Sequence, residues 1–133
     1  MEFPESIKRK NLCINSLEAL TVLVSAKLWG KQWKGKKIVV HCDNEVSVSL
    51  INTGRSHTPF LQSCMRELEF VAAKCEFEIR ANHIPGVQNR IPDALSRWHI
   101  GPQYREAFWR HVAGLNVREV FVYEGLFEFV HEW

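Results

Sequence analysis

Three acidic residues stand at positions where carboxylates do chemistry in α/β proteins. Asp43 directly follows Ile38–Cys42, a short β-branched run that predicts a buried strand. Glu18 lies in the first turn of a predicted helix, and Asp93 lies in the first turn of another helix that follows a loop. Open α/β sheets bind ligands at the carboxyl ends of their strands, so the three side chains can converge beside Asp43.

Converging carboxylates repel one another, and they are stable only with a cation between them. Oxygen ligands of this kind favour Mg²⁺ or Mn²⁺ over zinc. Glu18, Asp43 and Asp93 are therefore the predicted metal ligands. Each also has a structural alternative, because Glu18 fits a capping box, Asp43 fits a helix cap and Asp93 complements a helix dipole.

The elements that must position these acids follow one another in an α/β order. They are a helix from about Leu17 to Trp29, the strand Ile38–Cys42, a helix over Glu45–Ile51, a helix opened by Thr58–Pro59, a strand over Phe77–Ala81 and a helix over Asp93–Arg97. This order predicts parallel central strands flanked by helices.

The C-terminal part has a different pattern. Pro102–Ala113 is predicted to be helical, and Val117–Tyr123 is predicted to be a strand. Leu126–Trp133 is apolar and fits either a strand or a helix. We therefore expect a C-terminal extension of α+β character.

Three segments, taken in order, resemble the ribonuclease H domain of retrotransposon reverse transcriptases. Cys13–Leu20 contains Glu18, Cys42–Asn44 contains Asp43, and the last segment runs from His83-Ile84-Pro85-Gly86 through Asn89–Arg97. The resemblance covers about residues 12–98. It is closest to the DIRS-like elements that use a tyrosine recombinase, and gypsy-type elements are more distant.

The resemblance implies a ribonuclease H fold and a role for each acid. Glu18 matches the family's helix glutamate, Asp43 its central-strand aspartate and Asp93 its last-helix aspartate, so all three would be catalytic. Family members cut the RNA strand of an RNA/DNA hybrid with two Mg²⁺ ions. Four further residues are the expected nucleic-acid contacts, although turn, capping and strand-end roles fit them equally: Asn44, His83, Asn89 and Arg90.

The chain departs from the family at its N-terminus. The family fold opens with a three-stranded antiparallel meander, and its first strand carries an aspartate that bridges both metals. Here only 17 residues precede Glu18, too few for three strands, and Met1–Leu12 contains no Asp. We therefore expect a ribonuclease H-like fold that lacks most of the meander, a weak or one-ion metal site, and little or no hydrolysis.

This comparison divides the chain into an N-terminal arm (1–11), a ribonuclease H-like domain (12–98) and an extension (99–133) that packs on or beside it. Without the first strand, the edge of the Ile38–Cys42 strand would be open. Either the predicted strand Val117–Tyr123 or a second copy of the chain would cover that edge, the latter making a homodimer.

Composition limits the remaining possibilities. Hydrophobic residues make up 46% of the chain, which is typical of a protein that folds. The net charge of +2 neither requires nor excludes a nucleic-acid partner. No apolar run could span a bilayer and the N-terminus is polar, so no membrane association or secretion is expected. Four cysteines without close spacing predict free thiols in a reducing compartment, the cytoplasm or the nucleus: Cys13, Cys42, Cys64 and Cys75.

Two other functions stay open on the sequence alone. A non-catalytic module domesticated from a retroelement would bind nucleic acid or protein through exposed aromatic and basic residues. Those residues are Trp98, Phe108, Trp109, Arg97, Arg105 and Arg110, although alternating aromatic residues more often form a core than a binding face. A zinc site would have to use His41, Cys42, Cys64 and His83, but their spacing matches no zinc motif.

Overall fold

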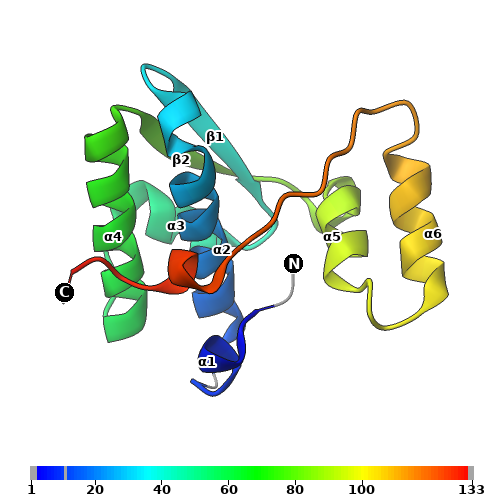
Figure 1. Cartoon of the computed structure of the whole chain (residues 1–133), viewed down its shortest axis with the longest axis horizontal. Coiled ribbons are helices and arrows are strands. Elements are labelled where there is room, and N and C mark those ends of the chain that lie inside the picture. Colours follow the sequence, from blue (N-terminus) through cyan, green and yellow to red (C-terminus); the bar gives the residue numbers. More distant parts are fainter. Residues whose placement is uncertain (1–2, 11, 132–133) are drawn as a thin grey trace. The chain divides into compact units, whose positions relative to one another are not determined.

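The protein combines helices with one two-stranded parallel sheet (Figure 1). The computed structural model describes residues 3–10 and 12–131. The elements are α1 (Glu5–Lys8), α2 (Ile14–Trp29), the 3₁₀ helix η1 (Gly30–Trp33), β1 (Lys37–Cys42), α3 (Glu45–Thr53), α4 (Pro59–Cys75), β2 (Glu78–His83), η2 (Gly86–Gln88), α5 (Arg90–Ser96), α6 (Pro102–His111) and η3 (Glu124–Phe127).

The chain forms two compact units. The smaller unit is Ile84–Val122, which holds η2, α5 and α6. The larger unit contains the described residues before Ile84 together with Tyr123–His131. The C-terminal segment therefore belongs with the N-terminal part of the chain and not with the helices that directly precede it.

The predicted order of elements and the parallel pairing of the strands are confirmed. β1 pairs with β2 in the register Lys37↔Glu78 to Cys42↔His83. Because parallel strands cannot be joined by a tight turn, the chain between them crosses over through α3 and α4. The helix predicted at Asp93 begins earlier, at Arg90, so Asp93 still lies in its first turn.

The core of the larger unit lies mainly between α2 and α4, which run side by side (Figure 1). Burying a large aliphatic side chain stabilises the folded state by about 1.5–3 kcal/mol. The largest apolar side chains with almost no exposure are Leu20, Leu23 and Val24 of α2 and Met65 and Leu68 of α4. This packing fixes the direction of α2, whose first turns carry Asn15 and Glu18.

The sheet has one covered face and one open face. Ile38, Val40 and Cys42 are half-buried, whereas the alternating residues of β1 are exposed. In β2, Ala81 is buried, whereas Arg80 and the residues two positions before and after Arg80 are exposed. The helices of the larger unit therefore cover only one side of this strand pair.

The two edges of the sheet differ. At β2, the Asn52 side chain of α3 accepts a hydrogen bond from the Ala81 N–H at 2.8 Å and donates one to the Ala81 carbonyl at 2.9 Å. Asn52 thus occupies the place of a neighbouring strand. At β1, the pairing register turns the N–H and C=O groups of Val39 and His41 away from β2. No described residue hydrogen-bonds to these groups.

The smaller unit is a pair of short helices with its own core. Ala94, Phe108 and Val112 are buried, and Ile91, Trp98 and Ala107 pack against them. Trp98 meets Phe108 edge to face, with ring centroids 5.6 Å apart. The expectation that Phe108 is an exposed binding residue is therefore wrong, because it fills the contact between α5 and α6; Trp98 is half-buried and Trp109 is exposed.

The strand predicted at Val117–Tyr123 does not form, and the chain there has neither helix nor strand. Strand propensity acts through neighbours on a pleated surface, and this segment has no pairing partner. The apolar residues Leu126 and Phe127 follow this segment. They belong to η3, which packs against α2, and both are buried. Residues 99–131 of the extension therefore contain helices and no strand, and they do not cover the β1 edge by strand pairing.

Candidate functional site

Glu18 is held by a helix other than its own. The Ser47 hydroxyl of α3 donates a hydrogen bond of 2.6 Å to Glu18 Oε2, and Ser47 is buried. α2 begins at Ile14 with Cys13 as its N-cap residue, so Glu18 does not complete a capping box. The bond from Ser47 fixes the direction in which the Glu18 carboxylate points.

Asn44 links the same two helices. Its side-chain oxygen accepts hydrogen bonds from the N–H groups of Val46 at 2.8 Å and Ser47 at 3.3 Å, which caps α3. Its amide nitrogen donates to the Asn15 side chain at 2.7 Å. Asn44, and not Asp43, is therefore the helix cap, and the first turns of α2 and α3 meet where β1 ends.

Glu18 and Asp43 come from different elements that meet near the end of β1. Ser47 in the first turn of α3 bonds to Glu18, and Asp43 stands between the last residue of β1 and the cap of α3. Both carboxylates therefore lie near this end of the strand, although they are 25 positions apart in sequence. Burial, and then the negative charges of Glu18 and Asp43, raise the pKa of the Cys42 thiol there. Two of the three predicted ligands gather at the carboxyl end of this strand.

Asp93 belongs to the smaller unit, so its convergence with the other two acids stays a prediction. It forms an ion pair with Arg97 one helical turn later, with 3.5 Å between Oδ1 and Nε. Nearby, the Arg90 guanidinium donates to the Val87 carbonyl at 3.0 Å.

The other predicted nucleic-acid contacts also divide between the units. His83 ends β2 and is exposed, and Asn89 precedes α5 without a capping hydrogen bond from its side chain. Within each unit, the described residues include no group of three or more His, Cys, Asp or Glu side chains that could hold a metal ion. His41, Cys42, Cys64 and His83 all lie in the larger unit, but these described residues form no such group, which counts against the zinc alternative.

The cysteines are free thiols, as predicted, but only Cys64 is fully buried. Burial raises the pKa of Cys64 to about 12, which keeps it protonated and unreactive at neutral pH. Cys13 is exposed, and a hydrogen bond with the Ser16 hydroxyl lowers its pKa.

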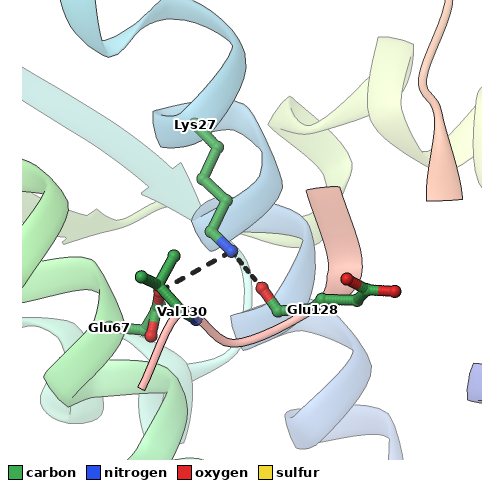
Figure 2. A network of polar contacts seen from close by, with 4 residues as sticks. All are labelled: Lys27, Glu67, Glu128 and Val130. Atoms are coloured by element: carbon green, nitrogen blue, oxygen red, sulfur yellow. Dashed lines mark hydrogen bonds and ion pairs between the residues drawn. The ribbon is translucent and has the colours of Figure 1, made fainter. Parts of the chain in front are cut away.

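The structure also contains a buried charged network that the sequence did not predict (Figure 2). Glu67 of α4 has no exposed surface, and Lys27 Nζ of α2 lies 3.8 Å from its Oε1. The Val130 N–H donates to Glu67 Oε1 at 2.8 Å, and Lys27 donates to the Glu128 carbonyl. Burial lowers the pKa of Lys27, and the charge of Glu67 opposes that shift. The network ties the C-terminal segment to both core helices.

One signal in the sequence does point to this network. Glu67 falls between Cys64 and Leu68 on the buried face of α4, where a carboxylate requires a partner. The partners themselves lie 40 and 63 positions away along the chain, at Lys27 and Val130. Helical periodicity carries no information about contacts at that separation.

Comparisons with protein-family models, curated proteins and solved structures find no match to this chain. Among the described residues, no helix has the length and apolar character required to cross a bilayer. The function is therefore argued from the chain's own residues.

We predict that Glu67→Leu lowers the free energy of unfolding by about 3–5 kcal/mol, because it leaves the Lys27 ammonium buried without its carboxylate. The double variant Glu67→Leu/Lys27→Met should recover most of that loss. Chemical denaturation measures both changes. Glu69→Leu, an exposed change on the same helix, is the control and should shift stability by less than about 0.5 kcal/mol. A single variant as stable as the control would show that the ion pair contributes nothing.

Proposed function

We propose that this chain is a ribonuclease H-like domain derived from a retrotransposon reverse transcriptase, with weak or no hydrolytic activity. The placement of Glu18 and Asp43 near the carboxyl end of β1 carries the proposal. One acid belongs to a helix that bonds to the start of α3, and the other directly follows β1, a strand of the parallel pair. This is the edge of an α/β sheet at which ligands bind.

The chemistry of the donors fits Mg²⁺ or Mn²⁺. Glu18 and Asp43 supply oxygen ligands, and the Ser47 hydroxyl orients Glu18 as outer partners of metal ligands do. The resemblance to the ribonuclease H family adds Asp93 as a third ligand. A bound ion would supply the activation of water and the stabilisation of the leaving oxygen. With two acids in the larger unit and no first-strand aspartate, we expect weak ion binding.

The substrate class follows from the same proposal. An RNA/DNA hybrid would lie across the carboxyl end of β1, where Asn44 keeps one amide hydrogen free of its bond to Asn15. His83 at the end of β2, with Asn89 and Arg90 from the smaller unit, would contact the nucleic acid. Such a domain, with four free thiols, would act inside the cell, in the cytoplasm or the nucleus.

A second candidate function is nucleic-acid binding without catalysis. In the smaller unit, the Arg105 guanidinium lies 5.9 Å from the Trp98 ring, and that of Arg97 lies 5.7 Å from the Tyr104 ring. Trp109 beside them is 58% exposed. Arginines stacked on aromatic rings are a surface on which unpaired bases can also stack, and they do not need a metal.

A hybrid-binding and cleavage experiment separates these functions. We expect Mn²⁺ to strengthen binding of an RNA/DNA hybrid by about tenfold or more, since the acids and the ion together attract phosphate, with little or no RNA cleavage. Asp43→Asn should abolish the Mn²⁺ effect, and Glu69→Gln should keep it. Fluorescence anisotropy measures binding, and gel electrophoresis of labelled RNA measures cleavage.

Each other outcome has a definite meaning. Metal-independent, salt-sensitive binding that persists in Asp43→Asn supports the second candidate. Cleavage that Asp43→Asn abolishes contradicts the predicted loss of activity, and absence of any binding contradicts both candidates.

We also propose that the open edge of β1 pairs with the same edge of a second copy. Antiparallel pairing about Val39 would place Val39 opposite its counterpart and Lys37 opposite His41. Each outward N–H and C=O group would then find a partner. At the other edge of the sheet, Asn52 occupies the N–H and C=O groups of Ala81 within β2, which disfavours pairing there and favours a dimer.

Substitution of Val39 by proline tests this pairing. Val39→Pro removes an outward N–H and leaves the hydrogen bonds to β2 intact, so it should convert a dimer to a monomer. Val39→Thr keeps the N–H and should remain dimeric. Sedimentation velocity over a range of concentrations measures the change. A wild-type chain that is monomeric throughout, or a dimer that survives Val39→Pro, would refute edge pairing.

A further inference from the structure

The segment Glu128–His131 is bound to the larger unit through its backbone (Figure 2). Lys27 of α2 donates to the Glu128 carbonyl, and the Val130 N–H donates to Glu67 of α4 at 2.8 Å. Glu128 has extended dihedral angles, with φ −86° and ψ 144°. The chain bends at Glu128, Val130 and His131. One ammonium and one carboxylate therefore hold two backbone groups of a single short, bent segment.

Aromatic contacts accompany these hydrogen bonds. Phe129 packs against Phe60, with ring centroids 5.6 Å apart, and His131 meets Phe70 edge to face at 4.7 Å. Phe60, Glu67 and Phe70 are spaced by seven and three positions, which places them along one stripe of α4. The stripe therefore carries the Phe60 ring, the Glu67 carboxylate and the Phe70 ring in that order. Its two rings contact the rings of Phe129 and His131, which stand at alternate positions of the segment.

A buried ion pair is a poor device for holding a segment permanently, since apolar residues of similar size would hold it as well or better. Charges aimed at backbone groups instead fix the direction and register of the chain that they hold. The segment is also open to solvent on its far side, where Val130 is 66% exposed. Leu126 and Phe127 of η3 anchor the chain directly before the segment, so detachment concerns only the residues that follow η3.

We propose that the surface around Lys27 and Glu67 is a binding site for short peptides that carry aromatic rings at alternate positions. The chain's own Glu128–His131 segment is a detachable occupant of that site. A segment of the same chemistry, from another chain, would bind in its place through the same two backbone hydrogen bonds and the rings of Phe60 and Phe70. This inference does not depend on the proposed nuclease ancestry.

Hydrogen exchange on the unmodified chain tests detachment. The Val130 amide should exchange through openings that leave the amides of Leu68 and Val71 in α4 protected, by at least about a hundredfold in rate. Exchange of all three amides at one common rate under native conditions would mean that the segment leaves only when the unit unfolds, and it would overturn the proposal.

Peptide binding tests recognition. A fluorescent peptide of residues 123–133 should bind the full chain carrying Phe129→Ala, which weakens its own segment. The same peptide with an N-methyl group on Val130 lacks the N–H that Glu67 accepts, and it should bind about tenfold more weakly or less. The matched variant Phe121→Ala, at an exposed position outside the site, should bind no more peptide than wild type. Equal binding of both peptides, or no binding of either to folded Phe129→Ala, overturns the proposal.

Discussion

Parallel pairing of β1 and β2 is the constraint on which the larger unit depends. Two parallel strands require a long crossover, and here α3 and α4 supply it. The pair is too small to be stable alone, so its covered face needs the helices that pack on it. The position of each acid, cap and buried charge in this unit follows from how α2, α3 and α4 meet those strands.

The candidate site arises where this arrangement brings helix starts to a strand end. Polar groups in the first turns of α2 and α3 bond to one another, through Asn15 with Asn44 and Glu18 with Ser47. These bonds hold Glu18 against the first turn of α3, which Asp43 and Asn44 directly precede. The cation of the proposed site would lie between the two carboxylates. Edge pairing and the peptide site use other surfaces of the same unit.

Local patterns in the sequence predicted most of the fold. Thr58–Pro59 starts α4 and Gly54, with φ 68°, ends α3, as turn chemistry predicts. Alternation at Phe77–Ala81 predicted the strand and its buried face. The failures came from contacts between distant residues. The residues around Val117–Tyr123 do not reveal that this segment lacks a strand to pair with. The residues around Glu67 do not reveal that its partner is Val130.

The candidate site was predictable in the same uneven way. Asp43 could be placed at a strand end because the strand was recognisable, and Glu18 because its helix was. The Ser47 contact could not be predicted, since it depends on the angle between two helices. Asp93 lies in the other unit, so a shared site with the first two acids rests on the resemblance to the ribonuclease H family.

The most direct test of this account is an NMR titration of the intact chain with Mn²⁺, which broadens resonances near the bound ion. The account predicts that the signals of Glu18 and Asp43 broaden together at low Mn²⁺ and that Asp43→Asn prevents the broadening at both. Broadening at only one of them, or no selective broadening at either, would contradict the claim that these acids form one metal site.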